Sequence, residues 1–70
     1  MILFNSIEFE YRSGVLIREL AECFYKNLPK IDFEDFIVIV NSTALTSKQA
    51  EERVLEDNDI VYLVPKLDGG

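Results

Sequence analysis

Hydrophobic and polar residues alternate near the start of the chain. Every second residue from Ile7 to Tyr11 is apolar, and the residues between and after them are charged. This period of two is typical of a half-buried strand. The apolar run over residues 1–4 is followed by Asn5-Ser6, and asparagine readily adopts the positive φ of a two-residue hairpin turn. The pattern therefore predicts an N-terminal antiparallel hairpin, with a strand over residues 7–12.

After Gly14 the apolar spacing becomes helical. Apolar residues recur at intervals of three and four between Val15 and Leu28, which predicts one amphipathic helix of about fourteen residues. We expect Pro29 to end this helix, because proline lacks an N–H group and disfavours helical backbone at the residue before it.

The second half of the chain contains the remaining strands. A β-branched run and a later apolar run are apolar on both faces, so we expect strands with little exposure there. An acidic turn, with Asn58 in a left-handed conformation, precedes the last strand. The expected elements are strands at residues 36–40, 43–45 and 60–64, and one helical turn within residues 46–53.

This order of elements predicts an α+β fold with a mixed four- to five-stranded sheet and one main helix on one face. A hairpin, a helix and late strands favour the β-grasp, or ubiquitin-like, arrangement, in which the last strand lies parallel to the first at the centre of the sheet. A parallel pair needs a crossover connection, and the helix supplies it. We expect a β-grasp domain over residues 1–65 and a flexible C-terminal diglycine tail over residues 66–70.

The last strand also predicts an interface. If Val61 and Leu63 face the helix, alternation turns their neighbours to the other side of the sheet. A chain of this size has no second layer to cover them, and exposed apolar patches mark protein interfaces. Two alternatives remain: residues 46–55 cover the patch, or the strand has the opposite phase. The expected interface residues are Ile60, Tyr62, Val64 and, on the first strand, Leu3.

Composition narrows the classes of partner. The 70 residues are 49% hydrophobic and carry 13 acidic and 7 basic side chains, giving a net charge of −6. This charge disfavours binding to nucleic acid and to anionic membranes. It favours a protein partner with a basic groove, or simply keeps the chain soluble. We expect a monomer when the chain is free.

Few side chains have the properties of catalytic or metal-binding groups. Histidine is absent, and the single cysteine, Cys23, permits no internal disulfide and is expected to be an inert structural thiol. Asp57 and Asp59 fit turn chemistry better than a cation site. We therefore expect no catalytic residue, metal or bound cofactor. The N-terminus lacks the basic flank of a signal peptide and no apolar run could span a bilayer, so we expect a cytoplasmic protein.

The C-terminal residues are the most informative feature. Gly69 and Gly70 follow Leu67 and Asp68 directly after the last strand. Glycine has no side chain to clash and adopts backbone conformations closed to other residues, so such a tail can enter a narrow active site of another protein. The alternative is an accidental ending or a cloning remnant.

Taken with these residues, the chain resembles the ubiquitin-like sulfur carriers of thiamine and molybdopterin biosynthesis, the ThiS/MoaD family. The family usually has glycine where Asn58 stands, often glycine at Ser42, and commonly a threonine cap at Leu16, so either Ser13 or Gly14 caps this helix or its first turn frays. The opening half is more similar to the thiamine branch and the ending to the molybdopterin branch. The resemblance rests on residues 2–5, Gly14, residues 38–41, residues 55–59 and Gly69-Gly70.

The resemblance implies a function as a protein substrate rather than an enzyme. An adenylating partner would use ATP to activate the Gly70 carboxylate, a sulfur donor enzyme would convert it into a thiocarboxylate, and a downstream synthase would receive the sulfur. Gly69, Asp68 and Leu67 would form the tail, and Lys66 would join the partner interface.

Two other functions remain open. The chain could be a ubiquitin-like modifier that is conjugated through Gly70 to target lysines. It could also be a non-reactive β-grasp interaction domain, whose ending is incidental.

Overall fold

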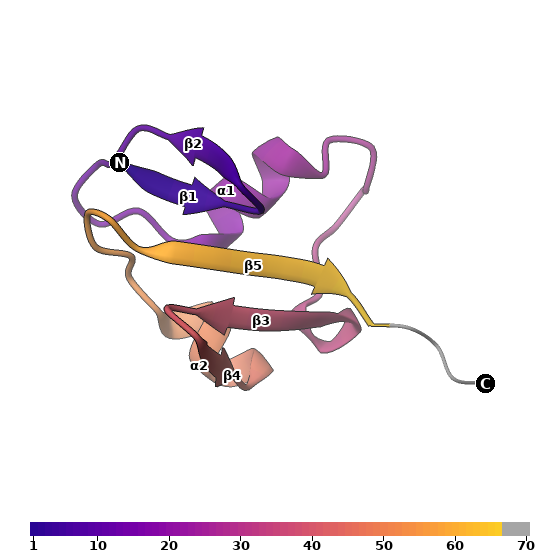
Figure 1. The fold of residues 1–70 in the computed structure, drawn as a ribbon. Helices are drawn as coiled ribbons and strands as arrows, with labels where there is room; N and C mark the ends of the chain where they lie inside the picture. The colour runs from indigo at the N-terminus through magenta and orange to yellow at the C-terminus, as the bar shows by residue number, and fades with distance from the viewer. Residues whose placement is uncertain (67–70) are drawn as a thin grey trace.

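The computed structural model describes residues 1–66, which form a small α+β fold. Strands and helices follow one another without a long unstructured insertion (Figure 1). The elements are β1 (Ile2–Phe4), β2 (Ile7–Phe9), α1 (Ile17–Phe24), the 3₁₀ helix η1 (Phe33–Asp35), β3 (Phe36–Val40), β4 (Thr43–Leu45), α2 (Ser47–Glu52) and β5 (Ile60–Pro65).

The five strands form one mixed sheet in the order β2-β1-β5-β3-β4. The last strand, β5, lies at the centre, parallel to β1 and antiparallel to β3 (Figure 1). The prediction that the last strand lies beside the first in parallel is therefore confirmed. Helix α1 lies on the crossover between the two hairpins, as a parallel central pair requires.

Both hairpins turn on an asparagine followed by a serine. Asn5 and Ser6 have φ values of 49° and 67°, and Asn41 and Ser42 have values of 50° and 71°. Positive φ at both central residues is the mark of a type I′ turn, which matches the twist of the flanking strands. The predicted turn at Asn5-Ser6 is confirmed, and so is the positive φ of Asn58, at 72°.

Helix α1 is shorter than the predicted span from Val15 to Leu28. It ends at Phe24, because Tyr25 leaves the helical conformation with φ −105° and ψ 60°. The Tyr25 hydroxyl instead donates a hydrogen bond to the Leu63 carbonyl at 2.8 Å. Pro29 therefore does not end the helix. At the other end neither Ser13 nor Gly14 is the cap: Leu16 is, and its N–H donates to the Glu19 carboxylate at 2.8 Å.

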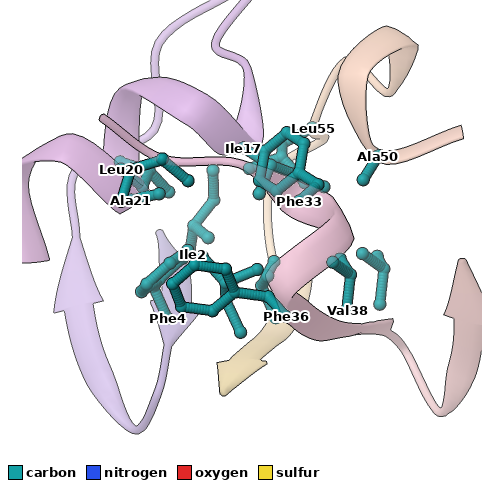
Figure 2. Close-up of a cluster of buried hydrophobic side chains, with 14 of the residues drawn as sticks. Ile2, Phe4, Ile17, Leu20, Ala21, Phe33, Phe36, Val38, Ala50 and Leu55 are labelled. Atoms are coloured by element: carbon teal, nitrogen blue, oxygen red, sulfur yellow. The ribbon is translucent and has the colours of Figure 1, made fainter. Parts of the chain in front are cut away.

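The core lies between one face of the sheet and the helices. Figure 2 shows α1 side chains facing Ile2 and Phe4 of β1, with Phe36 and Val38 of β3 beside them. Phe4 also meets Phe9 and Phe24 with ring centroids 5.9 and 5.6 Å apart. Burying these rings against one another supplies much of the driving force for a domain this small.

Two predicted strands differ from the observed ones in length or exposure. β2 ends at Phe9 rather than extending to residue 12, and Ile7, on this edge strand, is half exposed. β3 occupies the predicted residues, but Ile37 is 43% exposed, so its apolar character on both faces does not indicate burial on both faces. β5 extends one residue further than predicted, to Pro65.

Candidate functional site

The central strand β5 has one buried and one exposed face. Val61 and Leu63 are fully buried, whereas Ile60, Tyr62 and Val64 are 41–43% exposed. The phase in which Val61 and Leu63 face the helices is therefore correct, and the opposite phase is wrong. Three large apolar side chains in alternate positions of one strand point to the side of the sheet away from α1.

Neighbouring strands extend this exposed apolar surface. Leu3 of β1 pairs with Ile60, while on β3 Ile37 lies opposite Val64 and Ile39 opposite Tyr62. Leu3 and Ile39 are half-buried and the others exposed. We call this surface the outer apolar face, made of Leu3, Ile37, Ile39, Ile60, Tyr62 and Val64. The four residues of β1 and β5 were predicted, but Ile37 and Ile39 were missed, because residues 36–40 are all apolar and their pattern does not show which side chains are exposed.

Residues 46–55 lie on the opposite side of the sheet from this face. α2 contacts η1, α1 and the edge strand β4, and its Ala50 is buried in the core. Leu55 is buried as well, and its N–H bonds to the Val15 carbonyl before α1 at 2.9 Å. The alternative in which this segment covers Ile60, Tyr62 and Val64 is therefore wrong.

Side chains from outside the strand hold β5 in position. The Asn5 amide group accepts a hydrogen bond from the Leu63 N–H at 2.8 Å and donates one to the Leu63 carbonyl at 2.9 Å. In this way the Asn5 side chain continues the β1–β5 ladder after the backbone of β1 has turned away. Because Tyr25, the residue after α1, donates to the same carbonyl, the strand is fixed to the end of α1 as well as to β1.

The first residue of β5 is held in a similar way. The Asn41 amide oxygen accepts from the Ile60 N–H at 2.9 Å, and its NH₂ donates to Asp59 at 2.8 Å. Asp59 is only 5% exposed and also accepts from the Glu56 N–H at 2.8 Å, while the Arg53 guanidinium lies 3.7 Å away. These partners satisfy a carboxylate that burial would otherwise destabilise. Both Asn-Ser turns thus anchor the central strand.

The acidic turn before β5 also binds the start of the chain. The Met1 ammonium donates to Asp57, and the Met1 carbonyl accepts from the Asn58 N–H at 2.9 Å. The hydrogen bond from the ammonium is the main reason why the pKa of Asp57 lies below its ordinary value of 3.8. Asp57 and Asp59 therefore have the structural role expected of turn residues, and this role accounts for their position beside β5.

The chain leaves the sheet at Lys66. Its backbone N–H donates to the Asp35 carbonyl of η1 at 2.9 Å, and its side chain is exposed. This bond fixes the chain beyond Pro65 and places Lys66 beside the end of β5 where Val64 lies on the outer apolar face. The predicted tail residues Leu67, Asp68, Gly69 and Gly70 lie outside the described residues.

Other candidate chemistry within residues 1–66 is sparse. Cys23 is exposed on α1, and its expected role as an inert thiol stays a prediction. No group of three or more potential metal ligands lies together in this part of the chain. None of the helices among the described residues has the length and apolar character needed to cross a membrane.

Neither a family model nor a curated protein matches this sequence. The functional interpretation therefore depends on the geometry of the outer apolar face, on the chemistry of the C-terminal residues and on the resemblance stated for the sequence.

Proposed function

We propose that this chain is a sulfur carrier protein of the ubiquitin-like, β-grasp type. In this proposal an adenylating partner activates the Gly70 carboxylate, a sulfur donor enzyme converts it into a thiocarboxylate, and a synthase receives the sulfur for thiamine or molybdopterin biosynthesis. The strand order with a parallel β1–β5 centre and an α1 crossover is compatible with a β-grasp fold.

The observation that carries the proposal is the position of β5. This strand displays Ile60, Tyr62 and Val64 on the outer apolar face, and the same strand leads through Lys66 toward the diglycine. A partner that covers the face therefore docks next to the point from which the tail leaves. Immobilising a tail costs conformational entropy, which burial of apolar surface at the docked face would offset.

The chemistry assigns the reactive steps to partner enzymes. A free carboxylate is a poor acyl donor, so an oxygen of Gly70 would first attack the α-phosphorus of ATP and displace pyrophosphate. A donor persulfide would then attack the acyl carbon and displace AMP, and a donor thiol would reduce the resulting acyl disulfide to leave the thiocarboxylate. This chain would contribute the docking surface and the carboxylate, with ATP bound by the partner.

Intact-mass analysis tests this function. The chain would be isolated from its native host without acid or strong reductant, and we expect a free species heavier by one oxygen-to-sulfur exchange. Digestion should locate the exchange at Gly70. Higher-mass isopeptide conjugates would instead favour a protein modifier, and full cellular function after deletion of Gly70 would favour a non-reactive interaction domain.

A pair of variants tests the role of the outer apolar face. Tyr62→Asp places a charge at the centre of the face and should weaken binding to the adenylating partner by about 2 kcal/mol or more, as at an interface hot spot. Val54→Asp is the matched control, because Val54 is as exposed as Tyr62 but pairs with Leu16 before α1. Both variants should stay folded by circular dichroism. Equal affinities of Tyr62→Asp and the unaltered chain would remove Tyr62 from the interface.

A further inference from the structure

The two edges of the sheet differ in a way that the proposed function does not use. β2 and β4 are the edge strands, each three residues long. Proteins commonly protect an edge with charged side chains, because its unpaired backbone groups otherwise attract another strand. Along β2 and the residue after it the chain carries Glu8 and Glu10. Along β4 and the residue after it, over residues 43–46, no side chain is charged.

The register shows which backbone groups are open at the β4 edge. Thr43 pairs with Val40 directly beside the two-residue turn, and Ala44 pairs with Ile39. In such a hairpin the pair next to the turn exchanges both hydrogen bonds, and the following pair exchanges none. The Ala44 N–H and C=O therefore point away from β3, toward the open edge.

A shallow depression of about 250 Å³ lies beside this edge. Leu45 of β4 lines it together with Gln49 and Glu52 of α2 and the following Arg53. This volume is smaller than the roughly 300–1,000 Å³ of pockets that hold small molecules, and it suits a single side chain. An open strand edge next to a side-chain pocket is the arrangement used when an extended peptide adds a strand to a sheet.

The charges around the depression indicate which side chain it would accept. The Arg53 guanidinium already faces the buried Asp59 carboxylate at 3.7 Å, so its charge is compensated. Glu52 is exposed, and it forms no ion pair with any residue from 1 to 66. A lysine or arginine of a partner could therefore lay its aliphatic stem on Leu45 and place its cation at Glu52. The net charge of −6 favours such a basic segment over an acidic one.

We propose that the β4 edge binds an extended, basic peptide segment of another protein by strand addition. The Ala44 backbone exchanges hydrogen bonds with the peptide, and the groove between β4 and α2 accepts one lysine or arginine. Alternate residues of the peptide then lie beside Ala44 and extend the outer apolar face past Ile39. This site lies at the β4 edge, whereas Lys66 follows the central strand β5, and the site does not depend on the reactivity of Gly70.

The probe for this site is a capped seven-residue peptide that alternates valine and threonine around one central lysine. Titrated into the isotopically labelled chain, it should shift the amide signals of residues 43–46 and of Gln49 and Glu52, and it should slow hydrogen exchange at the Ala44 amide. Shifts confined to β2, or no shifts at millimolar peptide, would overturn the proposal.

Proline substitutions at the two edges provide a matched pair. Ala44→Pro removes an N–H that the hairpin does not use, so the fold should survive while the peptide binds about tenfold more weakly. Glu8→Pro likewise removes an outward-pointing N–H, but at the β2 edge, because Glu8 pairs with Leu3 in the position that corresponds to Ala44. This variant should leave the affinity for the peptide unchanged. Equal affinity of Ala44→Pro and the unaltered chain would refute strand addition at β4.

A second pair tests the charge preference. Glu52→Gln should weaken binding of the lysine peptide about threefold, in the range of an exposed ion pair, and should leave unchanged the binding of a peptide with norleucine in place of lysine. Sedimentation without peptide completes the test. A dimer that Ala44→Pro abolishes would show that β4 pairs with a second copy of the chain, which would also overturn the proposal.

Discussion

The shared carbonyl of Leu63 permits a quantitative test of how β5 is held. It accepts hydrogen bonds from the Asn5 amide at 2.9 Å and from the Tyr25 hydroxyl at 2.8 Å. One of the two donors is enough to satisfy this oxygen, but loss of both leaves the Leu63 carbonyl with neither hydrogen bond. We therefore predict that removing both donors destabilises the fold by more than the sum of the two single effects.

The magnitudes follow from the bonds that each substitution removes. Asn5→Gly keeps a residue that adopts φ 49° without strain but removes two bonds to Leu63, so we expect a loss of about 2 kcal/mol in the free energy of unfolding. Tyr25→Phe keeps the ring in place between Phe24 and Phe36 and removes one bond, which costs about 1 kcal/mol. The double variant should lose about 4 kcal/mol, because an unpaired, part-buried carbonyl adds about 1 kcal/mol.

Urea denaturation of the four proteins measures the coupling. The midpoints should fall while the slopes stay similar, because the same surface becomes exposed on unfolding. Hydrogen exchange distinguishes the two single variants. The Leu63 N–H donates to the Asn5 side chain and not to Tyr25, so its exchange should accelerate in Asn5→Gly and not in Tyr25→Phe. Additive losses within about 0.5 kcal/mol, or equal acceleration in both single variants, would refute this account of the clamp.

Three further predictions concern other parts of the chain. Deleting Gly69 and Gly70 should abolish thiocarboxylate formation in the intact-mass assay. The thermal midpoint should stay nearly unchanged, because the hydrogen bonds and buried side chains described above lie within residues 1–66, and a large fall in the midpoint would contradict this. Ser42→Gly should stabilise the fold by about 0.5–1 kcal/mol in urea denaturation, since glycine adopts the φ of 71° at lower cost, and a loss of stability would show that the serine side chain contributes more than its strain. The lowered pKa of Asp57 means that its interaction with the N-terminal ammonium stabilises the fold above pH 3.8, and that this stabilisation is lost as the pH falls through the lowered value. Asp57→Asn should therefore make the free energy of unfolding fall less steeply at acid pH. An unchanged fall would count against this interaction.

Local patterns predicted the strands and their turns well. The alternation of side chains over residues 60–64 left two possible phases of the strand, and the one taken first, with Val61 and Leu63 toward the helix, is correct. Asn5-Ser6 predicted a hairpin, because positive φ is a property of the residue type and the loop length. These features depend on residues that are close in sequence, which is why one sequence sufficed to predict them.

Long-range contacts explain the features that were missed. The apolar spacing runs on to Leu28, but the Tyr25 hydroxyl bonds to Leu63, 38 residues away, and the helix ends before it. Asp59 is one of several acids in an acidic turn, yet it is buried, and Asn41, 18 residues earlier, donates a hydrogen bond to its carboxylate. No local pattern reports such a partner. The candidate site divides in the same way, since the exposed residues of β5 were predicted and those of β3 were not.

The central position of β5 has a consequence for how the protein is made. The hairpins β1–β2 and β3–β4 each consist of neighbouring segments and can form early, but within the sheet they are joined through residues 60–65, which the ribosome adds after both of them. Closing the parallel β1–β5 pair joins residues more than fifty positions apart, a slow kind of step in folding. A chain that ends before residue 60 lacks β5, so its two hairpins are not joined in a sheet and apolar side chains of both stay uncovered. Such a chain is exposed to aggregation and proteolysis.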